Sequence, residues 1–190
     1  MGLGNPGAKF KATRHNVGAQ VVETLAKRHA VLLRGPRGIP AICGEARVEL
    51  KGGTRRLALA LPQTFMNDSG IAVAALVSRY GLEDLHRLVI VHDELDLPAG
   101  EVRVKLAGGL AGHNGLKSIK AHLHDDGFVR VRVGIGKPPA PSQGINHVLS
   151  RPSKAESALL EIAVGTAADA VEAVLEAGPE AAMNRFNARS

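Results

Sequence analysis

The stretch GLGNPGAKFKATRHNVG (residues 2–18) joins a glycine-rich turn to the start of a helix. Its three closely spaced glycines permit backbone shapes and close approaches that other residues resist, and Pro6 stiffens the turn by fixing its own φ. The turn presents the side-chain amide of Asn5, and the helix start carries the imidazole of His15. A rigid loop that offers an amide beside a titratable imidazole indicates a hydrolytic site rather than a structural turn.

The rest of the chain alternates predicted strands and helices. Period-two patterns and short apolar runs predict strands over 42–50, 55–61, 88–91, 101–106 and 129–135. Helical periodicity predicts helices that begin at Thr13, span 67–80, follow the glycine-rich AGGLAGHNG as far as about His124, and span 153–177 before a short helical tail. We read 34–40 and 138–144 as loops. The pattern predicts an α/β fold, a three-layer sandwich with a twisted mixed sheet between helices, in which residues 1–190 form a single domain.

Composition narrows the class of protein. Of the 190 residues 45% are hydrophobic and 22% charged, as in folded soluble proteins. The net charge of +6 and a pI near 9.8 indicate a polyanionic partner such as nucleic acid. Aromatic residues make up only 3%, so we expect contacts to phosphates and overall shape rather than base stacking. One cysteine, Cys43, and no membrane-length apolar run predict a cytoplasmic protein without a membrane partner.

Polar side chains gather at the predicted carboxyl ends of the strands. Asn5 lies in the glycine turn, Asn67 opens a helix, Asp93 follows the strand 88–91, and His113 and Asn114 stand where the glycine loop enters a helix. This edge of an open α/β sheet is where ligands bind. We expect Asp93 to orient His15 as a general base, with the amides holding an extended peptide.

Simpler interpretations exist for each of these residues. Asn67 alone reads as a helix N-cap, Asp93 as a turn acid, and His15 as an exposed residue in a first helical turn. Lys105, Arg103, Arg130 and Arg132 alternate along strands and individually read as solvent-facing residues. Only the joint pattern favours a functional site.

Nucleotide binding and metal-dependent hydrolysis have weaker support in the sequence. The spacing Gly2-x-Gly4-x-x-Gly7 matches a dinucleotide fingerprint, but only Met1 stands where the required strand should be. His92, Asp93, Asp96 and His113 are possible metal ligands, yet the chain lacks paired helical histidines, a calcium loop and a cysteine cluster. We therefore expect no metal and no cofactor.

Nucleophilic catalysis has weaker support than water activation. Ser69 lies outside a nucleophile elbow, and Cys43 lies within a predicted strand, where a buried thiol is usually inert. A non-enzymatic RNA-binding module stays open, because basicity alone does not separate carrying RNA from cleaving something attached to it.

Taken together, GLGNPG, TRHNVG, PQTFMNDSG, VHDELDLPAG and GHNGLKS followed by VRVGIG resemble bacterial peptidyl-tRNA hydrolases. The motifs occur in that family's order and spacing and cover nearly the whole chain. The resemblance implies an esterase that cuts the ester between the peptide and the 3′ ribose of peptidyl-tRNA, needs no metal or cofactor, and acts as a monomer. The alternative is a catalytically silent RNA-binding relative of the same fold, which the presence of His15 disfavours.

The resemblance also implies roles for individual residues. His15 would be the base that activates water, and Asp93 would orient it. The substrate's peptide end would lie against a set of residues at the cleft: Asn5, Phe10, Met66, Asn67, His113 and Asn114. The tRNA phosphates would be held by basic side chains of the strands: Arg103, Lys105 and Arg132.

Three features depart from the family pattern. Phe10 replaces a common tyrosine, so any hydroxyl contact from that position is absent. Ala107 and Ala111 replace glycines, so either a positive φ there is strained or the loop is slightly reshaped. The family places an apolar strand before GLGNPG, where this chain has only Met1. Either translation starts upstream or a shortened strand is tolerated, and we expect its neighbour to be unpaired and the Asn5 turn to be less firmly held.

Overall fold

The structure, a computed structural model, describes residues 1–138 and 140–188. Its strands are β1 (Ala41–Leu50), β2 (Gly53–Pro62), β3 (Val89–Glu94), β4 (Val102–Leu106) and β5 (Val129–Gly134). Its α-helices are α1 (Val17–Arg28), α2 (Ser69–Arg79), α3 (Asn114–Leu123), α4 (Gly144–Leu149) and α5 (Lys154–Phe186). Single 3-10 turns lie at Arg14–Asn16, Met66–Asp68, Leu85–Arg87 and Pro141–Gln143.

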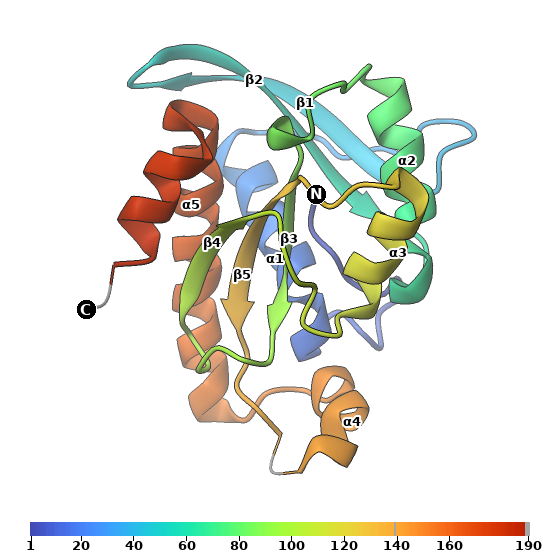
Figure 1. The fold of residues 1–190 in the computed structure, drawn as a ribbon, viewed down its shortest axis with the longest axis vertical. Helices are drawn as coiled ribbons and strands as arrows, with labels where there is room; N and C mark the ends of the chain where they lie inside the picture. The colour runs from blue at the N-terminus through green and yellow to red at the C-terminus, as the bar shows by residue number, and fades with distance from the viewer. Residues whose placement is uncertain (139, 189–190) are drawn as a thin grey trace.

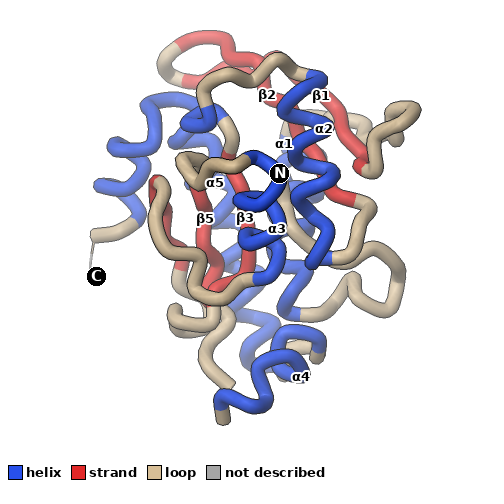
Figure 2. The backbone as a smooth tube through the Cα atoms, turned by 45° about the vertical axis from the view of Figure 1, so that its right-hand side comes forward, coloured by secondary structure: helices blue, strands red, loops and turns tan. Residues whose placement is uncertain are grey.

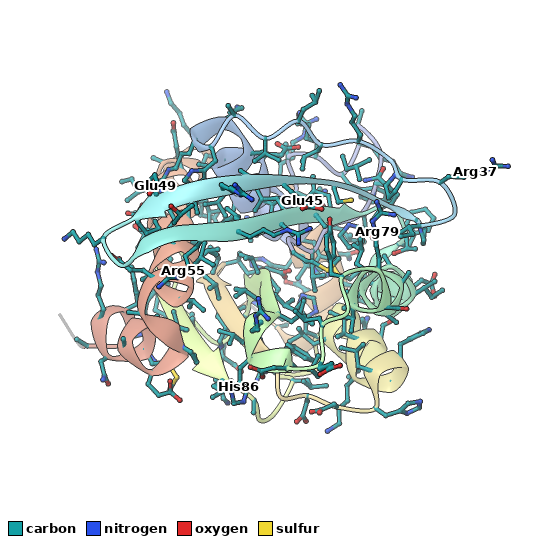
Figure 3. All side chains as sticks on the ribbon, turned by 90° about the horizontal axis from the view of Figure 1, so that it is seen from above. Arg37, Glu45, Glu49, Arg55, Arg79 and His86 are labelled. Atoms are coloured by element: carbon teal, nitrogen blue, oxygen red, sulfur yellow. The ribbon has the colours of Figure 1, made fainter. Side chains whose placement is uncertain are left out.

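The central sheet is mixed, as predicted. Its strand order is β3-β5-β4, with β3 parallel and β4 antiparallel to β5. Strands β1 and β2 form an antiparallel hairpin. Figure 3 shows this hairpin from above as a long ribbon that carries Glu45, Glu49 and Arg55, all exposed, along its length.

The first three residues join the hairpin to the sheet. On one side Leu3 N donates to Val91 O (2.9 Å), and Val91 N donates to Met1 O (2.8 Å). On the other side Gly2 N donates to Ala60 O of β2 (3.1 Å). Successive backbone groups of an extended chain point in opposite directions, so three residues suffice to bond both neighbours. The expectation of an unpaired neighbour is therefore wrong along this segment.

Helices flank the mixed sheet on two sides (Figure 1). Helices α1 and α5 pack against one face, where Val91, Val131, Val133 and Val104 are almost fully buried with them. Helices α2 and α3 pack on the opposite face, around Ile90. Figure 2 shows α4 apart from both pairs of helices, beyond one end of the sheet. In the described residues no helix combines the length and the apolar character needed to cross a membrane.

The structure corrects several boundaries. Strand β3 runs on to Glu94, so Asp93 lies on the strand rather than after it. Most of the loop predicted over 138–144 is described, and it contains a 3-10 turn that leads into α4, which the sequence reading missed; Pro139 lies outside the described residues. The predicted break after 177 is present, since Gly178 (φ 85°) and Pro179 interrupt α5.

Candidate active site

The carboxylate of Asp93 lies between two imidazoles at the end of β3. His15 Nδ1 lies 2.8 Å from its Oδ1 and 3.0 Å from its Oδ2, and His113 Nε2 lies 3.0 Å from Oδ1. Asp93 is buried, and burial alone would raise its pKa, yet the charges and hydrogen bonds of His113 and His15 hold that pKa well below its usual range. Asp93 is therefore a carboxylate that accepts hydrogen bonds from both rings.

The hydrogen bonds also define which ring nitrogens are free. His113 caps α3, and its Nδ1 accepts from Leu116 N (3.4 Å), which places its proton on Nε2, the atom facing Asp93. His15 uses Nδ1 on the same carboxylate. In the neutral ring its Nε2 then carries a lone pair, which is the arrangement that a general base needs.

A third histidine, His92, packs against His113 and bonds the backbone of Asp93. His92 is 1% exposed, and its Nδ1 donates to the backbone oxygen of Asp93 (2.7 Å). Its ring packs edge-on against that of His113, with centroids 4.9 Å apart. Burial lowers the pKa of His92 to about 3, so His92 is a neutral packing residue at physiological pH.

The Asn5 turn is held firmly, which corrects the expectation of a loose one. Asn5 N donates to Asn16 Oδ1 (3.0 Å), and Asn16 Nδ2 donates back to Asn5 O (2.9 Å). The Asn5 side chain is fixed as well, because its Oδ1 accepts from Met66 N (2.8 Å). Because the oxygen of the Asn5 amide faces Met66, its Nδ2 group points away from Met66 and can donate to another group.

The other predicted peptide-binding residues flank this centre. Met66 is buried beside Asn5, whereas Asn67 and Asn114 are exposed neighbours of Met66 and His113. Asn67 lies in a 3-10 turn, and α2 starts two residues later, so it is not the N-cap of that helix. Phe10 packs edge-on against Phe65 with centroids 6.3 Å apart, and Phe65 is 58% exposed.

The predicted phosphate-binding residues share one face of the sheet. Arg103 is opposite Arg132 in the β4–β5 ladder, and Lys105 is two residues further along β4. Arg132 Nε bonds Glu94 (3.0 Å), and Arg103 is paired with Glu101. The Lys105 side chain has no hydrogen bond or ion pair to any residue that the structure describes, so it is the most available of the three.

His15, Asp93 and His113 also offer potential metal-ligand atoms, all within 4.8 Å of one another. A zinc ion requires unprotonated imidazole nitrogens about 2.0–2.1 Å from it. Here both rings point N–H donors at the carboxylate instead. As arranged, the three residues fit a proton-transfer site better than a metal centre.

A cavity of about 740 Å³ opens elsewhere, between β2, α2 and α5. Its lining is mainly apolar, with residues such as Leu25, Leu57 and Val174, and it includes none of the polar residues around Asp93. We therefore place the candidate active site at the polar side chains around Asp93 and not in this cavity.

Comparison with known proteins decides the family. A family model described as peptidyl-tRNA hydrolase matches residues 1–190. The peptidyl-tRNA hydrolase of Rubrobacter xylanophilus is 51% identical over 190 residues, which cover 100% of both chains. That of Cutibacterium acnes is 43% identical over an alignment covering 98% of this chain and 96% of the relative.

This chain belongs to the peptidyl-tRNA hydrolase family.

The three-dimensional comparison agrees with that assignment. The crystal structure of peptidyl-tRNA hydrolase from Acinetobacter baumannii superimposes with a TM-score of 0.91 at 35% identity, covering 100% of this chain and 93% of that one. The α/β fold with a mixed sheet between helices is therefore the peptidyl-tRNA hydrolase fold. Members of this family are carboxylic ester hydrolases, and the cluster of His15, Asp93 and His113 is consistent with a hydrolase site.

Several residues that build this peptidyl-tRNA hydrolase site were missed in the sequence. Asn16 holds the Asn5 turn, and Arg14 bonds Glu156 in a bidentate pair (3.0 and 2.8 Å). Both lie within the TRHNVG motif, so their position next to His15 was the available signal. Phe65 likewise stands inside a quoted motif, next to Met66.

Proposed function

We propose that the chain hydrolyses the ester between the peptide and the 3′ ribose of peptidyl-tRNA with a water molecule activated by His15. The observation that carries this assignment is the buried Asp93 carboxylate, which accepts from Nδ1 of His15 and so leaves Nε2 as the base. A positioned base of this kind contributes about 10²–10⁴-fold to the rate.

The reaction follows from that geometry. Water transfers a proton to His15 Nε2 as its oxygen bonds to the ester carbonyl carbon, and the former carbonyl oxygen becomes an oxyanion. When the tetrahedral intermediate collapses, the bond from carbon to the ribose oxygen breaks, and the imidazolium returns its proton to that oxygen. Free tRNA and a peptide carboxylic acid leave, and His15 is neutral again.

Amide groups complete the proposed site. The Nδ2 group of Asn5 is free to donate to the oxyanion, because Oδ1 is already bonded to Met66 N. One such donor lowers the barrier by roughly 3 kcal/mol. Asn67 and Asn114 are exposed on either side and would bind the peptide backbone, while His113 holds Asp93 in place and Phe10 with Phe65 supports the peptide end.

The tRNA would be held through its phosphates. Lys105, Arg132 and Arg103 lie on one sheet face, and recognition of this kind accepts every tRNA sequence. We further propose a cytoplasmic monomer without metal or cofactor, in which residues 1–190 are one domain; the family match over that whole range supports the single domain.

Release of peptide from purified peptidyl-tRNA tests the mechanism. We expect hydrolysis to continue in EDTA and to fall by at least about 10²-fold in His15→Ala and Asp93→Asn. His86→Ala, a change at an exposed histidine outside the site, is the matched control and should keep full activity. Full activity in His15→Ala would refute the base. If the unaltered chain binds tRNA but releases no peptide, the silent RNA-binding alternative is correct.

A further inference from the structure

Arg130 is a buried arginine that bonds a loop rather than an acid. It lies on β5 with 2% of its surface exposed. Its guanidinium donates to three successive carbonyl oxygens: those of Ala107, of Gly108 (2.9 Å) and of Gly109 (2.8 Å). In the described residues no carboxylate pairs with it. The two terminal nitrogens of this buried charge bond backbone oxygens, while its Nε has no partner among the described residues, and these bonds tie the carbonyls to the sheet.

The loop that Arg130 bonds, residues 107–112, has a strained backbone with few hydrogen bonds of its own. Ala107 (φ 54°) and Ala111 (φ 48°) adopt the left-handed region, where a β-carbon is strained, and Gly108 and Gly112 also have positive φ. The loop's own backbone bonds are sparse; one is His113 N to Leu110 O (2.9 Å). External bonds from Arg130 therefore supply much of what fixes the loop.

The same loop delivers two residues of the site. Four residues after Gly109 comes His113, whose Nε2 bonds Asp93 (3.0 Å), and Asn114 follows directly. A displacement of the loop backbone would move both side chains. We propose that Arg130 is a positioning residue of the hydrolase, which clamps the loop 107–109 and thereby places His113 on Asp93 and Asn114 at the cleft.

This role differs from a phosphate contact. The terminal nitrogens of Arg130 are occupied by the loop, and its side chain is buried, whereas Lys105 opposite it on β4 has no hydrogen bond or ion pair to any described residue. A residue that grips phosphate changes the salt dependence of tRNA binding when it is removed, and a residue that positions the loop does not. The inference rests on the proposed roles of His113 and Asn114.

The experiment compares Arg130→Lys and Arg130→Gln with the unaltered chain in hydrolysis of peptidyl-tRNA. Lysine keeps the charge but bonds fewer carbonyls, and glutamine also removes the charge, so both variants should lower kcat. We expect a loss of about 10-fold or more for glutamine, because a small misplacement of catalytic groups costs up to about 10²-fold. The salt slope of tRNA binding should stay unchanged, because no phosphate contact is removed. Arg28→Gln removes an arginine that bonds Asp169 and Glu172 between helices, and should keep kcat. A flattened salt slope with normal kcat would overturn the proposal in favour of a phosphate contact.

A double-mutant cycle separates positioning from general loss of folding. If Arg130 acts through the loop's two side chains, Arg130→Gln should add little once His113 and Asn114 are both alanine. An equal loss of kcat in that background would overturn the proposal. Hydrogen exchange of the amides of 107–113 is independent of activity and should be faster in Arg130→Lys; unchanged exchange would also overturn the clamp. If exchange is faster in Arg130→Lys but the alanine variants of His113 and Asn114 keep full kcat, the proposed roles of His113 and Asn114 are refuted instead.

Discussion

Asn5 and Asn16 bond each other reciprocally, the backbone amide of Asn5 donating to Asn16 Oδ1 and Asn16 Nδ2 donating to the backbone oxygen of Asn5. Both are buried, and the two bonds connect the glycine turn to the residue after His15. The side chain of Asn16 therefore ties the turn that carries Asn5 to the backbone segment that carries His15.

Asn16→Ala should lower stability and activity together. The change leaves a buried N–H and a buried carbonyl without their partner, which destabilises by about 1–3 kcal/mol, and it frees the Asn5 turn. Urea unfolding and peptide release measure the two effects. Asn184→Ala, at an exposed asparagine of α5, should stay within about 0.5 kcal/mol of the unaltered chain. Equal stability of the two variants would contradict the role given to Asn16.

Ala107→Gly and Ala111→Gly should each stabilise the fold by up to about 1 kcal/mol. Both alanines have a positive φ, and glycine removes the β-carbon strain of about 1–2 kcal/mol, less its own entropic cost. Ala158→Gly, at an exposed position further inside α5, is the control of opposite sign and should destabilise by about 1 kcal/mol. A lower denaturation midpoint for both loop variants would show that the strain has been misjudged.

Stability should depend on Glu156 in acid. The backbone N–H and hydroxyl of Ser153, with Arg14, lower the pKa of Glu156 to about 2 from an ordinary 4.5. Because the folded pKa is the lower one, the stabilisation is complete above pH 4.5 and disappears as pH falls toward 2. The free energy of unfolding of Glu156→Gln should therefore fall less steeply over that interval. Parallel curves for the two proteins would contradict the assignment.

Lys105→Glu should weaken tRNA binding and reduce its salt slope by about 1 or more, since one phosphate contact is lost. Arg132→Gln is preferred to a reversal at that position, because an acid there would face the buried carboxylate of Glu94. Filter binding over a range of salt concentrations measures both variants. Lys51→Glu, at the exposed turn of the hairpin, carries the same charge change as a control; a slope that falls equally in all three would point to net charge alone.

The sequence predicted the layers, the mixed sheet and the pairing of His15 with Asp93, because these follow from hydrophobic period and from motifs in a known order. Helix α4 escaped prediction because its residues lie in a segment rich in proline and glycine and bury little surface. Arg130 alternates on β5 like a solvent-facing residue, and only the loop folded over it makes it buried. Asn16 gave no signal beyond its place beside His15, since its partner is backbone eleven residues away.

The short segment Met1–Leu3 also affects the order in which parts of the fold unfold. In the described chain the hairpin β1–β2 is bonded to this segment by the single backbone bond from Gly2 N to Ala60 O. Apart from that bond, the two sheets share only side-chain packing among the described residues. The hairpin should consequently open as its own cooperative unit, with amides that exchange together and before those of β3 and β5.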